Sequence, residues 1–132
     1  MPDFVFYKLD NSPFTDKNIQ KGGKVFFLFF DSDCDHCQHA LANLDRHYSR
    51  FKKTAIYLVT LDNRNKINYF LSTYGPDLKN KKNITILQDY RNQFIGKFQP
   101  RKYPSMLLFS QTGRLLIYED EPEKMSFIYK KL

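Results

Sequence analysis

A short apolar run followed closely by two cysteines is the feature that most restricts how this chain can fold. Residues 25–30 (VFFLFF) form a continuous apolar stretch of the length expected for a strand buried on both faces. The motif Cys34-Asp35-His36-Cys37 begins four residues later. From residue 34 to residue 53 apolar positions recur every three or four residues, which predicts a helix with one buried stripe. The cysteines are therefore expected at the start of a helix, with Ser32 or Asp33 as its N-cap.

The rest of the pattern alternates strands with helices and ends in a hairpin and a helix. Apolar or β-branched runs predict strands at residues 3–9, 25–30, 54–61, 84–87, 105–109 and 115–118, and turn residues 11–13 end the first. Helical spacing predicts helices at residues 34–53, 65–74, 90–98 and 121–132. This order is typical of an α/β fold with a mixed central sheet and helices on both faces. A length of 132 residues predicts a single domain over residues 1–132.

The cysteine pair carries the chemistry that the sequence predicts. A cysteine at a helix N-terminus faces unpaired backbone N–H groups and the positive end of the helix dipole, which favour the thiolate. Cys34 is therefore the candidate nucleophile, and Cys37, one turn further on the apolar stripe, is the candidate resolving thiol. A protonated His36 adds to the stabilisation of the Cys34 thiolate. The carboxylates of Asp33 and Asp35, together with that of Asp31, act in the opposite direction.

Two other interpretations of the cysteines stay open. They are either inert buried thiols that happen to lie three residues apart or part of a metal site with His36 and His39. On a regular helix the two histidines point away from the cysteine side chains, so the four groups cannot converge on one ion. Binding of Cu(I) or zinc by the two thiolates alone stays open, although we expect no metal site and no cofactor. A third histidine on the helix, His47, is expected at the surface.

Charge and hydropathy restrict the partners. The chain has 21 Lys and Arg against 14 Asp and Glu, a net charge of +7. These basic residues are spread along the chain, and the densest run, at residues 79–82, is typical of a solvated loop. No nucleic-acid partner is therefore expected, since such proteins have clustered basic residues. No stretch approaches the ~20 apolar residues of a membrane-spanning helix. The N-terminus resembles no export signal, although a trimmed exported protein would look the same.

Taken together, these residues resemble a thioredoxin-fold protein. The resemblance rests on the buried strand that ends in Cys34-Asp35-His36-Cys37, on Tyr103-Pro104 opening a later strand, and on the β-β-α-β-α order. It covers nearly the whole chain. The lead-in over residues 4–24 is similar to the N-terminal hairpin of the TlpA/ResA-like thiol-disulfide oxidoreductases.

The resemblance implies a function, and it adds substrate-binding residues to the cysteine pair. It implies disulfide exchange with protein thiol or disulfide substrates, a redox-recycling protein as partner, and no required cofactor. Pro104 matches the proline that has a cis peptide bond in this fold and lies against the cysteine pair. Tyr103 and Pro104 would shape the groove for an extended substrate strand. An exported, periplasmic monomer with a reducing or isomerising role is expected, with a cytoplasmic location open as an alternative.

Several positions depart from the patterns of related families. Asp33 stands where Trp is usual before the first cysteine, Leu28 stands where thioredoxin has a buried Asp, and Tyr103 stands where Thr or Val is commoner. Peroxiredoxins have Pro and Thr ahead of the reactive cysteine, whereas this chain has FDSD at residues 30–33. A thiol-disulfide oxidoreductase is therefore predicted, rather than thioredoxin itself or a peroxidase. The alternative is a metal-delivery protein or a non-catalytic thioredoxin-like binding module.

Overall fold

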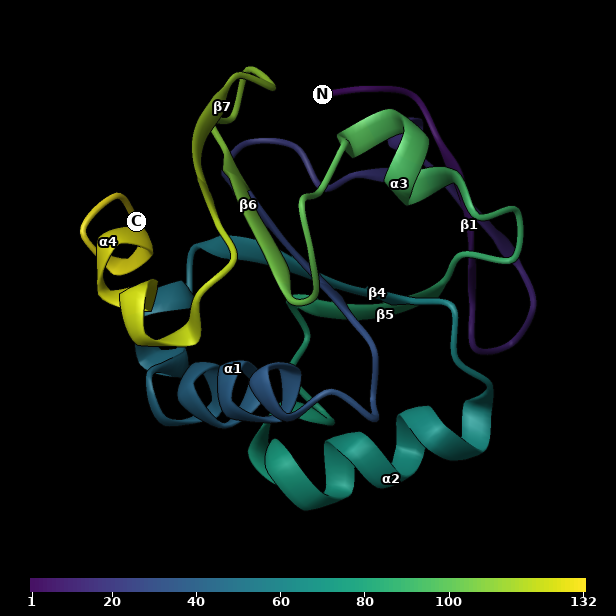
Figure 1. Cartoon of the computed structure of the whole chain (residues 1–132). Coiled ribbons are helices and arrows are strands. Elements are labelled where there is room, and N and C mark those ends of the chain that lie inside the picture. The colour runs from purple at the N-terminus through teal and green to yellow at the C-terminus, as the bar shows by residue number, and fades with distance from the viewer.

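A seven-stranded mixed sheet forms the centre of the computed structural model, which describes residues 1–132 (Figure 1). The strands are β1 (Val5–Lys8), β2 (Pro13–Thr15), β3 (Lys24–Phe30), β4 (Thr54–Thr60), β5 (Ile84–Gln88), β6 (Ser105–Phe109) and β7 (Leu115–Glu119). Their order across the sheet is β2-β1-β5-β4-β3-β6-β7. β3, β4 and β5 run parallel, whereas β1 and β6 pair antiparallel with β5 and β3. The mixed sheet predicted from the sequence is confirmed.

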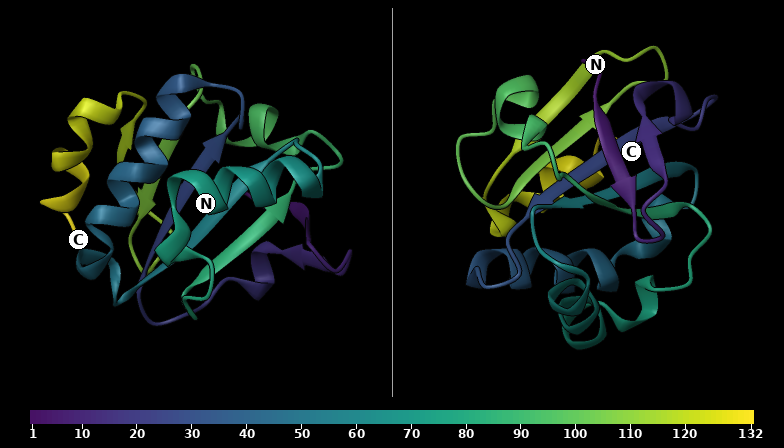
Figure 2. Two further views of the ribbon diagram at one scale, coloured as in Figure 1. Left: turned by 90° about the horizontal axis from the view of Figure 1, so that it is seen from below. Right: turned by 90° about the vertical axis from the view of Figure 1, so that its right-hand side faces the viewer.

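Helices cover both faces of the sheet. The α-helices are α1 (Asp35–Arg46), α2 (Arg64–Tyr74), α3 (Gln93–Phe98) and α4 (Met125–Tyr129). Short 3₁₀ helices occupy Asp16–Asn18, Tyr48–Phe51, Pro76–Leu78 and Pro122–Lys124. Helices α1 and α2 lie side by side under the sheet with α4 next to α1, and α3 lies on the opposite face (Figures 1 and 2). None of the helices combines the length and the apolar character needed to cross a membrane.

Strand β3 divides the core into two layers because successive side chains point to opposite faces. Phe26, Leu28 and Phe30 pack with α1, α2 and α4. Val25, Phe27 and Phe29 pack on the other face, in one cluster with α3 and with Phe4 and Phe6 at the start of β1. All six side chains are buried. The predicted burial of this strand on both faces is confirmed. This burial fixes the position of the residues that directly follow β3.

Several predicted boundaries differ from those of the structure. The helix predicted for residues 34–53 ends at Arg46, where the N–H of His47 is shared between the carbonyls of Asn43 and Leu44, and a 3₁₀ turn follows. The helix predicted for 121–132 shrinks to a 3₁₀ turn and the five residues of α4. Pro13, predicted as a turn residue, opens the edge strand β2, in which its missing N–H costs nothing.

The helix predicted for residues 90–98 begins only at Gln93. Asn92 has a left-handed backbone (φ 51°), so Tyr90 lies outside the helix and is 58% exposed. The buried carboxylate of Asp89 accepts hydrogen bonds from the N–H groups of Gln93 and Phe94, at 2.8 and 2.9 Å. Asp89 therefore caps α3 from outside the helix. The helix is about one turn shorter than the sequence predicts.

Candidate functional site

The carboxyl ends of β3 and β4 meet the start of β6 at one end of the sheet. Phe29 lies opposite Ser105 in the β3–β6 register, so the loop after β3 lies beside the segment that leads into β6. The Tyr103 ring packs on Phe29 with 5.1 Å between ring centroids. The Tyr103–Pro104 peptide bond is cis, the isomer that the resemblance implies. The fold thus brings the two parts of the predicted site, about 70 residues apart in sequence, to the same end of the sheet.

Cys34 occupies the N-cap of α1. Its backbone is extended (φ −93°, ψ 123°), and its Sγ accepts a hydrogen bond from the backbone N–H of Cys37 at 3.3 Å. The prediction of Ser32 or Asp33 as N-cap is therefore wrong, because the cysteine sulfur itself takes that place. Cys34 is partly exposed. Its sulfur thus has both solvent access and direct stabilisation from a helix N-terminal N–H group.

Cys37 lies one turn further and is fully buried. Its Sγ accepts a weak contact from the backbone N–H of Asp31, at 3.5 Å. Burial, and to a lesser extent the nearby Cys34 sulfur and Asp31 carboxylate, raise the pKa of the Cys37 thiol well above its ordinary value. The two thiols therefore differ in solvent access.

Tyr103 is partly buried and packs against both layers of the core. Burial raises the pKa of its phenol, and the charges of Asp31 and Asp62 raise it further. A smaller increase in that pKa comes from Cys37. Burial and the two carboxylates thus both favour the neutral phenol of Tyr103.

Carboxylates surround the loop that carries Cys34. Asp33 pairs with Lys66 at 3.1 Å, with both side chains half exposed or more. The hydrogen bond to Asp33 and the charges of Asp33 and Asp62 raise the pKa of Lys66. Asp62 also accepts a hydrogen bond from the N–H of Ser32, at 2.8 Å. Asp62 and Lys66 are site residues that the sequence analysis missed, although Asp62 lies two residues after the end of β4, which is parallel to β3, and so had to lie at the same end of the sheet.

The histidines of α1 have different environments. His36 and Asp35 are exposed beside Cys34, as is His39 one turn further. His47, predicted at the surface, is instead half-buried, with its Nδ1 3.0 Å from the Asn43 carbonyl and its ring stacked on Tyr129. No group of three or more His, Cys, Asp or Glu side chains is arranged to hold a metal ion.

Comparisons with known proteins identify the family and the fold. The model of the AhpC/TSA family matches residues 1–126. A thioredoxin-like protein from Aeropyrum pernix superimposes with a TM-score of 0.79 at 14% identity, over 98% of this chain and 89% of that one. A thiol-disulfide oxidoreductase from Bacteroides fragilis gives 0.78 at 19% identity, over 98% of this chain and 96% of that one.

A third match is a secreted Mycobacterium tuberculosis disulfide oxidoreductase. It gives a TM-score of 0.76 at 15% identity, over 98% of this chain and 96% of that one. A search of curated proteins finds no match. The predicted thioredoxin-like fold and the predicted resemblance to thioredoxin-fold thiol-disulfide oxidoreductases are confirmed.

Proposed function

Because this chain belongs to the AhpC/TSA family and has a thioredoxin-like fold, we propose that it is a thiol-disulfide oxidoreductase acting on protein substrates. The observation that carries the proposal is the asymmetry of the cysteine pair. Cys34 is partly exposed and accepts a helix N-terminal N–H, whereas Cys37 is buried within the same turn. Such a pair suits a nucleophile and a resolving thiol.

The proposed reaction takes two exchange steps. The Cys34 thiolate attacks one sulfur of a substrate disulfide, forms a mixed disulfide and releases the other substrate sulfur as a thiolate, which takes up a proton. Cys37 then loses its proton and attacks the Cys34 sulfur, which frees the second substrate thiol and closes the Cys34–Cys37 disulfide. Two electrons pass from the protein to the substrate, and the reverse sequence oxidises a dithiol. Another redox protein restores the starting state.

The other predicted residues take supporting roles in this proposal. His36, exposed beside Cys34, stabilises the thiolate, and Asp33 and Asp35 oppose it. Tyr103 and Pro104, at the same end of the sheet, line the groove for an extended substrate strand. We further propose that residues 1–132 act as one domain and as a monomer. Two structural relatives support an exported location: the secreted disulfide oxidoreductase of Mycobacterium tuberculosis and an exposed lipoprotein thioredoxin of Streptococcus pneumoniae.

Family membership alone leaves peroxide reduction as a competing activity. The residues before Cys34 argue against it, because FDSD at residues 30–33 lacks the Pro and Thr that precede the reactive cysteine of peroxiredoxins. The same segment carries the acidic residues Asp31 and Asp33, whereas a peroxide-binding site needs hydrogen-bond donors.

Insulin reduction driven by dithiothreitol tests the proposal. The wild-type protein is expected to accelerate insulin precipitation and to consume hydrogen peroxide no faster than buffer containing dithiothreitol. The Cys34→Ser variant is expected to lose the insulin activity, whereas a His39→Ala variant, changed one turn further along α1, retains it. A wild-type protein that does not reduce insulin, or one that consumes peroxide rapidly through Cys34, would refute the proposed function.

A further inference from the structure

The segment that carries Tyr103 and Pro104 lacks the usual backbone support. It links α3 to β6, and residues 100–104 belong to no helix or strand. None of these five residues makes a backbone–backbone hydrogen bond. A loop without such bonds opens readily unless side chains fix it. Whatever holds this loop therefore determines how Tyr103 and Pro104 are presented beside the cysteines.

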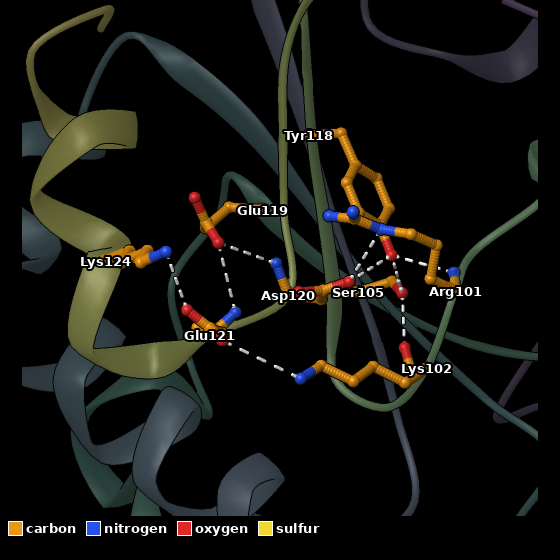
Figure 3. A network of polar contacts seen from close by, with 8 residues as sticks. All are labelled: Arg101, Lys102, Ser105, Tyr118, Glu119, Asp120, Glu121 and Lys124. Carbon is orange, nitrogen blue, oxygen red and sulfur yellow. Dashed lines mark hydrogen bonds and ion pairs between the residues drawn. The ribbon is translucent and has the colours of Figure 1, made fainter.

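Two hydroxyl groups hold the loop backbone (Figure 3). The N–H of Arg101 donates to the Tyr118 hydroxyl at 2.9 Å. The Ser105 hydroxyl donates to the carbonyl of Lys102 at 2.5 Å. The two hydroxyl oxygens lie 3.0 Å apart. Ser105 opens β6 and Tyr118 belongs to β7, so the loop is fastened to the β6–β7 hairpin on both sides of the Arg101–Lys102 peptide.

A buried carboxylate fixes the orientation of Tyr118. Asp120 accepts a hydrogen bond from the Tyr118 hydroxyl at 3.0 Å. It also forms an ion pair with Arg101, whose Nε lies 3.1 Å from the carboxylate. Its side chain is only 7% exposed, whereas that of Arg101 is 71% exposed. The Arg101 guanidinium also lies over the Tyr118 ring, 4.9 Å from its centroid. A buried carboxylate is costly unless it is paired and hydrogen-bonded, so Asp120 keeps both Tyr118 and Arg101 in place (Figure 3).

We propose that Tyr118 is a positioning residue of the redox site, acting through the loop at residues 100–104. With Ser105 and Asp120 it fixes the backbone immediately before Tyr103, so that Tyr103 and Pro104 meet an extended substrate in one conformation. A preformed loop reduces the ordering cost of substrate binding. The inference rests on the proposed function, because the loop is argued to receive the substrate of the cysteine pair. Tyr118 does not touch the sulfur atoms, so the intrinsic reactivity of Cys34 is independent of it.

Replacing Tyr118 with Phe tests the inference, since it keeps the ring and removes only the hydroxyl. The value of kcat/KM for insulin reduction is expected to fall about tenfold, mainly through KM. The rate of Cys34 alkylation by iodoacetamide, which needs no substrate groove, is expected to stay within about twofold of the wild type, because no group near the sulfur changes. Amide hydrogen exchange over residues 99–104 is expected to accelerate, with exchange in β3 and β4 unchanged.

The matched control is Tyr129→Phe. Tyr129 is also partly buried, and its hydroxyl donates to Asn43 on α1, away from the loop. This variant is expected to keep both the wild-type KM and the wild-type exchange over residues 99–104. A Tyr118→Phe protein with wild-type KM, or one in which insulin reduction and alkylation fall in parallel, would overturn the inference while leaving the proposed function intact. An inactive wild-type protein would instead overturn the proposed function and this inference with it.

Discussion

Cys34 and Cys37 lie within one helical turn yet in different surroundings. Cys34 is partly exposed and accepts the Cys37 N–H, whereas Cys37 is fully buried and has a raised pKa. The sequence predicted this division, because a helix start is open to solvent and the next turn lies on the apolar stripe. It did not predict that the Cys34 sulfur would itself cap the helix. Capping depends on the side-chain rotamer, and composition and spacing do not specify a rotamer.

The raised pKa of Cys37 predicts how the second exchange step depends on pH. Below its pKa only a small fraction of Cys37 is thiolate, and that fraction grows about tenfold for each pH unit. Burial is the main cause of the shift, and this cause does not depend on the charge of Cys34. Cys34 can be loaded with thionitrobenzoate as a mixed disulfide, and stopped flow then measures the rate at which Cys37 displaces it. Between pH 6 and 9 this rate should rise about tenfold per pH unit. A rate that levels off within this range would contradict the raised pKa of Cys37.

His36 provides a second prediction at this scale. Its imidazolium stabilises the Cys34 thiolate and therefore the reduced state, so His36→Ala is expected to lower the reduction potential. A loss of about 1.4 kcal/mol corresponds to ~30 mV for this two-electron couple. Asp33 is already paired with Lys66, which leaves less of its charge to offset the histidine. Equilibration with glutathione measures the potential, with His39→Ala as control. An unchanged or higher potential for His36→Ala would contradict the assigned role.

At the scale of elements, the sequence predicted which faces are buried better than where helices end. Apolar spacing correctly gave the buried stripe of α1 and both faces of β3. The start of α3 depends instead on the carboxylate of Asp89, which precedes the helix by four residues. Periodicity contains no information about such a contact, since it registers where apolar side chains recur and not which polar group reaches back to the backbone.

Removal of this carboxylate should destabilise α3 specifically. Asp89→Ala leaves the partly buried N–H group of Gln93 and the buried N–H group of Phe94 without their acceptors, which is expected to cost about 2 kcal/mol of unfolding free energy. Urea denaturation measures the loss. Glu123→Ala removes an exposed carboxylate that forms no ion pair and should change stability by less than about 0.5 kcal/mol. Equal stability of the two variants would show that Asp89 is not a structural cap.

At the scale of the whole molecule, the fold gathers charges that look dispersed in the sequence. Lys21, Lys24, Lys52 and Lys53 line one hollow at the start of β3 and β4, at the opposite end of these strands from Cys34. None of the four forms an ion pair. The sequence could not reveal this cluster, because its two halves meet only when β3 and β4 pair in parallel.

The unpaired lysines predict how stability depends on salt. With a net charge of +7, self-repulsion is strongest at low ionic strength, where the Debye length is about 30 Å at 0.01 M. Raising sodium chloride to about 0.15 M shortens it to about 8 Å. The melting temperature is expected to rise by about 3 °C, which corresponds to about 1 kcal/mol for a chain of this size. A Lys52→Gln, Lys53→Gln double variant should respond less. A melting temperature that falls with salt would contradict the repulsion argument.

The division of labour between the two cysteines is tested most directly by trapping the mixed disulfide. Cys37→Ser and Cys34→Ser proteins are each incubated with a disulfide-linked peptide pair, and the adducts are measured by intact mass and peptide mapping. Cys37→Ser is predicted to accumulate a stable adduct on Cys34, because no thiol remains to resolve it. Cys34→Ser is predicted to form almost none in the same time, because Cys37 is fully buried and its pKa is raised. Adduct formation on Cys37 as fast as on Cys34 would contradict the account.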